Sequence, residues 1–326
     1  MLGLVAGDAL GARRQLDVIL RKERMMAKTR YTVLHGQYRI HRADDPRRGP
    51  QPDGDTIRFE PANLELLASL PRFSARPPDI RSKGINVRYE GIDTLETHFD
   101  GAHQNDRFAF GARDRNLVLL GYKGVQFFAD EPNIVSAVDV DPLPGYVVAN
   151  GIESNGRLLG LVYVGVPPTE DGQPLFVDEA RLDGSVNATL VRAGLAYVEP
   201  YDTMPIALID RLRSIIAQAR ADNAGMFDSE NVGVEKPATI VTLNDLQALV
   251  MWPKLFRRLV TFIREGHSGL SEFDSWIRQD PVRRDDTLRL PNGEKANMHD
   301  TFEITGNRLS LRFNPEDLII APDPAP

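Results

Sequence analysis

Four segments in the first half of the chain carry side chains that could act on a phosphate ester. Asp55 begins one expected strand, and Arg88 lies on the next. The segment 93–96, Asp-Thr-Leu-Glu, ends that strand, and Arg157 begins another. Two carboxylates and a backbone carbonyl are oxygen ligands that Ca²⁺ or Mg²⁺ accepts, and two arginines can clamp a phosphate. A glutamate beside them can orient or deprotonate water, so the set favours metal-assisted phosphoryl chemistry.

Each of these motifs also has an ordinary structural interpretation. Asp53-Gly54-Asp55 is more often a plain turn, and Asp93-Thr94 is more often a helix cap or a loop. A single arginine on a strand usually makes a surface ion pair worth about 0 to 1 kcal/mol. The order and spacing of the whole set favour a common site, because the ends of strands can converge at one rim of a barrel.

Short strands and a few helices are expected to position these residues. Alternating apolar residues and turn signals predict strands at 31–34, 37–41, 56–59, 86–91, 146–150 and 157–166. A proline-rich insertion is expected at 61–86, and a partly helical stretch at 106–128. A clear helix is predicted to begin at Asp202 or Thr203 and to end at Gly225.

The composition changes after Val232-Gly233, which predicts a second unit. Two helices are expected within 242–263, broken at Pro253, and a third at 270–277, before short strands that end at 313. Arg257-Arg258 could touch nucleic acid, but a solvated helix face is the more common role of such a pair. We therefore predict an N-terminal arm (1–30), a first domain (31–232), a C-terminal α+β accessory domain (233–320) and a disordered tail (321–326).

The motifs resemble the staphylococcal nuclease-like (thermonuclease) family. The matching segments, in the order of the family, are 53–56, 87–96, 155–157 with Leu159 and Tyr163, and 184–196. The resemblance covers residues 30 to 230 approximately. It implies an α+β fold built on a five-stranded OB-type β-barrel with flanking helices. It also implies a nuclease that uses one Ca²⁺ ion to hydrolyse phosphodiester bonds in DNA or RNA and leaves 3′-phosphate products.

The resemblance assigns roles to residues by their position in the motifs. The ion would be held by two carboxylates and one backbone carbonyl, those of Asp55, Asp93 and Thr94. The scissile phosphate would be bound by two guanidinium groups, those of Arg88 and Arg157. Glu96 would position or activate the attacking water, and Tyr201 stands where the family has a tyrosine near the base.

Two positions depart from the pattern of the family. Leu95 replaces a common proline, which leaves the backbone conformation of the loop less constrained. Ser154-Asn155 replaces a Lys-Tyr or Arg-Tyr pair that contacts a terminal phosphate in many members. The alternative to an enzyme is a catalytically silent OB-type module that binds nucleic acid or protein. Because the carboxylates and arginines are all present, we favour the enzyme.

Composition and charge limit the class of protein. The chain has 326 residues, of which 42% are hydrophobic and 26% charged, and this excludes wholesale disorder and a fibrous protein. The absence of cysteine excludes a disulfide framework and a cysteine nucleophile. With a net charge of −7, the surface as a whole should repel polyanions, so any binding of DNA or RNA must be local.

The sequence also bears on partners and location. No apolar run approaches the roughly 18 residues that a membrane span requires. Arg13 and Arg14 follow the apolar start of the chain instead of preceding it, which reverses the charge order of a secretory signal. We therefore expect a cytoplasmic protein with no membrane partner. The C-terminal domain is a candidate surface for a protein partner or for homodimerisation.

Overall fold

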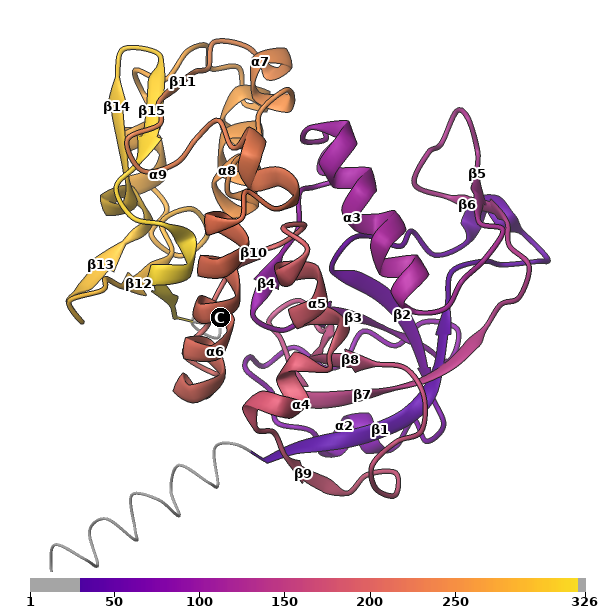
Figure 1. Cartoon of the computed structure of the whole chain (residues 1–326). Helices are drawn as coiled ribbons and strands as arrows, with labels where there is room; N and C mark the ends of the chain where they lie inside the picture. Colours follow the sequence, from indigo (N-terminus) through magenta and orange to yellow (C-terminus); the bar gives the residue numbers. More distant parts are fainter. Residues whose placement is uncertain (1–29, 322–326) are drawn as a thin grey trace, which may run out of the picture.

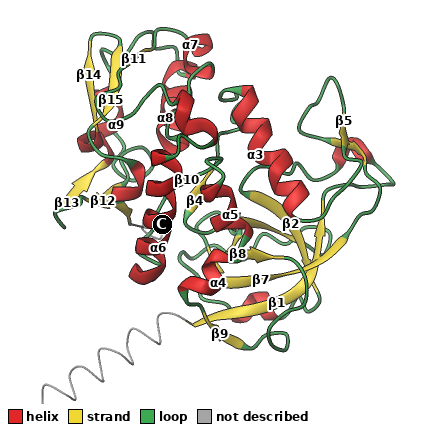
Figure 2. Cartoon of the chain, viewed as in Figure 1, coloured by secondary structure: helices red, strands yellow, loops and turns green. Residues whose placement is uncertain are grey.

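The structure, a computed structural model, describes residues 30–321 of the chain. The predicted arm at 1–30 and the predicted tail at 321–326 lie outside these residues, except for one residue each. Strands and helices are mixed along the described part, as expected for the α+β class (Figures 1 and 2). None of the helices in this part is long and apolar enough to cross a membrane.

Five strands close into a β-barrel. They are β1 (Arg30–Arg39), β2 (Thr56–Pro61), β3 (Ile85–Tyr89), β7 (Leu143–Ile152) and β8 (Leu158–Tyr163). β1 pairs with both β2 and β7, β2 pairs with β3, and β7 pairs with β8, all antiparallel. The parallel pairing of β3 with β8 closes the ring, which is consistent with an OB-type barrel. A short strand, β9 (Pro174–Phe176), extends the sheet from β1.

The alternating sequence of β2 and β3 decides which side chains face the barrel core. Ile57 and Phe59 of β2 and Val87 of β3 are fully buried, and the residues between them are not. Successive side chains of a strand point to opposite faces, so Arg58 and Arg88 lie on the outer face of the barrel. The alternation of side chains along β3 therefore places Arg88 outside the barrel core.

Helices cover the barrel on one side (Figure 1). The longer ones are α3 (Asp106–Leu119), α5 (Val186–Arg192) and α6 (Ile206–Ala221), and α5 packs on β8. Helix α6 begins at Ile206 with Pro205 as its N-cap, whereas Asp202 or Thr203 was the expected N-cap. The reason is tertiary, because the N–H of Asp202 donates to the carbonyl of Ile320 at 3.0 Å and the preceding residues run beside that strand.

Short elements connect these helices and strands. The short helices are η1 (Pro46–Arg48), α2 (Leu66–Ser69), α4 (Glu179–Asp183) and η2 (Gly225–Ser229). Two small antiparallel pairs are β5 (Gln126–Phe127) with β6 (Val135–Ala137), and β4 (Ile92–Asp93) with β10 (Tyr197–Val198). The pair of β4 with β10 lies next to the rim of the barrel and positions the predicted site segment 93–96.

The C-terminal part combines helices with two small sheets. The helices are α7 (Leu243–Gln247), α8 (Pro253–Arg264) and α9 (Phe273–Arg278), with η3 (Met298–Thr301) and η4 (Pro315–Asp317). One sheet has the order β11 (Ala238–Thr239), β15 (Arg308–Leu311), β14 (Phe302–Thr305). The other has the order β13 (Lys295–Asn297), β12 (Thr287–Arg289), β16 (Ile319–Ile320). The predicted break at Pro253 is confirmed, because α8 begins at that residue.

Buried apolar residues form two clusters. The first fills the barrel and the space under α3, α5 and α6, and the second lies among α8, α9 and the C-terminal sheets. The second contains the aromatic residues Phe256, Phe262, Phe273 and Trp276, and the ring centroids of Phe262 and Phe273 are 5.3 Å apart. Val250 belongs to the first cluster and Ala102 to the second, so the clusters interleave along the chain. The division into two domains at residue 232 stays a prediction.

Gly36 permits the closure of the barrel. It lies on β1 where that strand pairs with both neighbours, opposite Pro61 and Gly145. A Cβ at Gly36 would lie 2.3 Å from the carbonyl oxygen of Glu60 and 2.6 Å from the ring of Phe59. These distances are too short for any side chain, so β1 and β2 could not keep their spacing.

We predict opposite effects for two glycine-to-alanine substitutions. Gly36→Ala should lower the free energy of unfolding by about 1–3 kcal/mol, because the added methyl group overpacks the strand pair. Gly111→Ala should raise it by roughly 1 kcal/mol, because Gly111 lies inside α3 with open space around its Cα and alanine favours helix. Urea unfolding of the two variants tests this, and a neutral Gly36→Ala would contradict the account of barrel closure.

Candidate functional site

A large open cleft lies along the outer face of β2 and β3 and reaches α8. Its volume is about 2170 Å³. Six of the seven predicted site residues line it, and these are Asp55, Arg88, Asp93, Glu96, Arg157 and Tyr201. The seventh, Thr94, is buried beside the cleft, where its backbone N–H donates to Asp55 Oδ2 at 2.9 Å. The structure therefore brings the predicted residues to one surface of the molecule.

The charge of this cleft is opposite in sign to that of the chain. Thirteen Lys and Arg residues and eleven Asp and Glu residues line it, a net charge of +2, whereas the whole chain carries −7. Several of these cations, including Arg58, Arg76 and Lys83, make no ion pair with a described residue. A cleft with charges of one sign in excess concentrates ligands of the other sign, and here that ligand is an anion.

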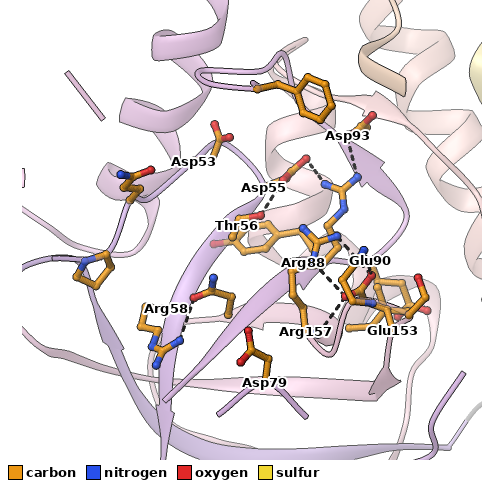
Figure 3. A pocket seen from close by; sticks show the side chains of 18 of the residues that line it. Asp53, Asp55, Thr56, Arg58, Asp79, Arg88, Glu90, Asp93, Glu153 and Arg157 are labelled. Atoms are coloured by element: carbon orange, nitrogen blue, oxygen red, sulfur yellow. Dashed lines mark hydrogen bonds and ion pairs between the residues drawn. The ribbon is translucent and has the colours of Figure 1, made fainter. Parts of the chain in front are cut away.

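Arg88 lies at the centre of a cluster of carboxylates. Its guanidinium contacts Asp55 and lies 2.6 Å from Asp93 Oδ1 (Figure 3). It also lies 3.5 Å from Glu199 Oε2. The side chain is 13% exposed. Burial alone would lower the pKa of Arg88, but the facing carboxylates outweigh burial and hold it well above its usual value.

Local structure explains how these three carboxylates meet Arg88. Asp55 directly precedes β2, and its carbonyl accepts from the N–H of Tyr89, the residue next to Arg88, at 2.9 Å. Asp93 lies on β4 opposite Tyr197 of β10, and Glu199 follows that strand. The loop before β2 can come close because Gly54 faces Thr94, where a Cβ would lie 2.4 Å from the hydroxyl oxygen.

A second arginine, Arg257 of α8, enters the same cluster. Its Nη2 lies 3.0 Å from Asp93 Oδ2, its Nη1 lies 3.2 Å from Asp93 Oδ1, and Nη1 also contacts Glu96. Burial alone would raise the pKa of Asp93, but Arg257 and Arg88 lower it below its usual value. The expectation of a solvated face is therefore wrong for Arg257, whose side chain is 19% exposed.

Glu96 keeps a proton more readily than an ordinary glutamate. Burial raises its pKa to about 7, Arg257 opposes this rise, and the negative charges of Asp93 and Asp55 add to it. A carboxyl group that titrates near neutral pH can take a proton from water and give it back, which is what a general base requires. Glu96 is thus the acidic residue of the cluster best suited to proton transfer.

Arg157 lies in the same cleft but has a different partner. Its Nε lies 3.1 Å from Glu153 Oε1, and its side chain is 33% exposed. In Figure 3 the dashed contacts of Arg157 run to Glu153, whereas those of Arg88 run to Asp55 and Asp93. The structure therefore gathers Asp55, Arg88, Asp93 and Glu96 into one network and leaves Arg157 outside it.

Sequence reasoning missed Glu199 and the role of α8. Glu199 is buried and accepts from Trp252 Nε1 at 3.1 Å and from the Tyr201 hydroxyl at 3.4 Å. The Nζ of Lys254 lies 5.5 Å above the Tyr201 ring. One signal was present, because cations at positions 254, 257 and 258 share one face of a helix whose opposite face is apolar. That spacing does not indicate which carboxylates these three cations contact.

The oxygen donors of this cluster suit Ca²⁺ in kind. Asp55, Asp93 and the carbonyl of Thr94 are hard oxygen ligands, and positive groups already lie between the carboxylates. Arg88 is shared by Asp55 and Asp93, and Arg257 stands in for a cation between Asp93 and Glu96. Within residues 30–321, no group of three or more His, Cys, Asp or Glu side chains is arranged to hold a metal ion. A requirement for Ca²⁺ stays a prediction.

Comparison with known proteins adds no relative. No family model and no curated protein sequence matches the chain. Membership of the thermonuclease-like family is therefore still a prediction.

Glu90 is a buried acid at the inner wall of the cleft. It follows β3, one of its oxygens accepts from the side chain of Asn150, and Oε2 has no hydrogen-bond partner among the described residues. Burial raises its pKa from 4.5 to about 7. The folded protein therefore holds a proton on Glu90 between these pH values, whereas the unfolded chain releases it.

We predict that Glu90 lowers the stability of the protein as the pH rises. From pH 4.5 to about 7 the folded state binds more protons than the unfolded state, so the free energy of unfolding falls, by up to about 1.4 kcal/mol per pH unit. In Glu90→Gln this loss should be absent, and urea unfolding at pH 5 and pH 8 should differ less than in the wild type. The exposed Glu303→Gln is the control, and an equal pH dependence in Glu90→Gln would refute the raised pKa.

Proposed function

We propose that this protein is a divalent-cation-dependent nuclease that hydrolyses phosphodiester bonds in DNA or RNA. The observation that carries the proposal is the position of Arg88 between Asp55 and Asp93 on the floor of a positively charged cleft. Asp55 comes from the segment 53–56, and Arg88 and Asp93 come from the segment 87–96, and each was expected in such a site from its motif. Hydrolysis of a phosphodiester can use cationic groups to bind the phosphate and a carboxylate to orient or deprotonate water, and the cleft supplies both kinds of group.

Each residue of the cluster has a chemical role in this proposal. Asp55, Asp93 and the carbonyl of Thr94 would hold a Ca²⁺ ion, which when bound polarises a phosphate oxygen. Arg88 binds the scissile phosphate and neutralises the charge that develops on it. Glu96, with a pKa of about 7, takes the proton of the attacking water. The water oxygen bonds to phosphorus while the bond to the 5′ oxygen breaks, and that oxygen takes a proton from solvent.

The basic residues along the cleft support a polymeric substrate. Arg58 of β2 lies on the outer face with Asn86 as a side-chain partner at 3.3 Å, and burial together with Arg81 lowers its pKa. The positive charge of Arg81 beside Arg58 is one that a bound phosphate would offset. A strand that passes Arg58 and reaches Arg88 would place one phosphate at each, because the two residues lie on adjacent strands of one face.

A second candidate is a module that binds nucleic acid without cleaving it. The observation that favours it is the pairing of the proposed catalytic groups with one another. Arg157 pairs with Glu153, and both oxygens of Asp93 face guanidinium groups. If these pairs do not open to substrate, the cleft retains its positive charge and binds nucleic acid only.

We predict cleavage of nucleic acid that depends on a divalent cation. Single-stranded DNA, duplex DNA and RNA are incubated with the protein in Ca²⁺ or in EGTA, and product ends are mapped. Arg88→Ala and Glu96→Gln should each lower the rate by about 10²-fold or more, because each removes a group that acts in the transition state. Arg278→Ala is the matched control, since Arg278 pairs with the exposed Asp274 outside the cleft.

Each result separates the two candidates. Loss of cleavage in EGTA and in both cleft variants supports the nuclease. Binding of labelled oligonucleotide without cleavage under every metal condition would refute the nuclease and favour the binding module. Equal cleavage by Arg88→Ala and the wild type would show that another site is responsible.

A further inference from the structure

Arg257 reaches the candidate site from a part of the chain that carries none of the predicted motifs. It lies on α8, whose apolar residues Leu255, Phe256 and Leu259 are fully buried in the second hydrophobic cluster. The motifs lie in the barrel and its flanking loops, between residues 53 and 196. The position of Arg257 is thus set by packing in the C-terminal part, and it does not depend on the strands that carry Asp55 and Arg88.

The contact of Arg257 is specific among the cations of α8. Lys254 Nζ lies 3.1 Å from Asp286 Oδ1, and Arg258 Nη2 lies 2.8 Å from Asp286 Oδ2. Only Arg257 of these three faces Asp93 and Glu96, and it bonds both oxygens of Asp93. A planar guanidinium matches a carboxylate in this two-bonded geometry, which a lysine cannot reproduce.

The residues that Arg257 contacts are the ones that the proposed nuclease needs. Asp93 would hold the Ca²⁺ ion, and Glu96 would activate water. Asp93 Oδ1 accepts from both Arg88 and Arg257, and Oδ2 accepts from Arg257, so three of the roughly four lone pairs of this carboxylate are in use. A Ca²⁺ ion that binds these oxygens at about 2.3–2.6 Å must therefore displace a guanidinium, and a positive charge left beside it would repel it. Either cation satisfies the same buried negative charge, and the occupation of the site is therefore a competition between them.

We propose that Arg257 is a built-in competitor of the divalent cation. Its guanidinium neutralises Asp93 and Glu96 when no ion is bound, and an ion binds only when this guanidinium leaves them. The inference rests on the proposed function, because that function supplies the ion. The apparent affinity for the ion is the intrinsic affinity multiplied by the fraction of molecules in which Asp93 is free. Helix α8 therefore sets the cation concentration at which the site can act.

The affinity for Ca²⁺ tests the proposal directly. Isothermal titration of the full chain with CaCl₂ compares the wild type with Arg257→Gln and with the control Arg258→Gln. Arg257→Gln should bind Ca²⁺ about tenfold more tightly, a typical size for coupling between two sites. Arg258→Gln should match the wild type, because Arg258 pairs with Asp286. A Kd for Arg257→Gln that equals or exceeds that of the wild type would overturn the proposal.

Thermal unfolding gives a second readout and covers a variant that folds poorly. Arg257→Gln should have a lower Tm than the wild type in EGTA, because Asp93 and Glu96 lose a counter-charge, and Ca²⁺ should raise its Tm more than it raises that of the wild type. If Arg257→Gln does not fold, Arg257→Lys replaces it and should bind Ca²⁺ about threefold more tightly, since an ammonium group cannot bond both oxygens of Asp93. An unchanged Kd in that variant would overturn the proposal as well.

The outcomes distinguish this inference from the proposed function. Equal Ca²⁺ affinity in all variants, together with cation-dependent cleavage, overturns the competition and leaves the nuclease standing. Tighter binding by Arg257→Gln without cleavage of any nucleic acid supports the competition and removes the nuclease. No Ca²⁺ binding by any of the proteins at millimolar concentration overturns both.

Discussion

The arrangement of the candidate site depends on the positive groups that neutralise a set of buried carboxylates. Asp55, Asp93 and Glu199 lie close together and away from water, which is costly unless a counter-charge is present. Arg88 contacts all three, and its position on the outer face of β3 follows from the alternation of that strand. The loop before β2, the strand β4 and the segment after β10 are thus held together by one guanidinium group.

The same carboxylates join the barrel to the C-terminal part. Arg257 contacts Asp93, and the Trp252 indole N–H donates to Glu199, so both residues link α8 or its start to the rim of the barrel. These links are polar, and they lie beside two apolar clusters that interleave along the chain. Polar contacts can exchange partners more easily than the side chains of a packed core can. Because residues of the barrel and of α8 line the same cleft, such an exchange of partners can control the chemistry there.

Much of the barrel could be predicted from local patterns. The alternation at 56–59 and 86–91 indicated strands, and the structure has β2 and β3 there, with Arg88 on the outer face. The break at Pro253 was also evident, because proline lacks an N–H and favours the first turn of a helix. The start of α6 could not be predicted, because residues 200–202 bond to the strand β16, more than a hundred positions later in the chain.

The sequence by itself determined the types of group present, the faces of the strands that carry them and the order of the motifs. The tertiary structure alone decided which charges meet. Arg157 has the expected position in its motif, yet a local turn pairs it with Glu153, and Arg257 pairs with Asp93, 164 positions earlier. Periodicity reports which way a side chain points relative to its own element. It does not report which distant element lies opposite, because that depends on the packing of α8 against its own apolar cluster.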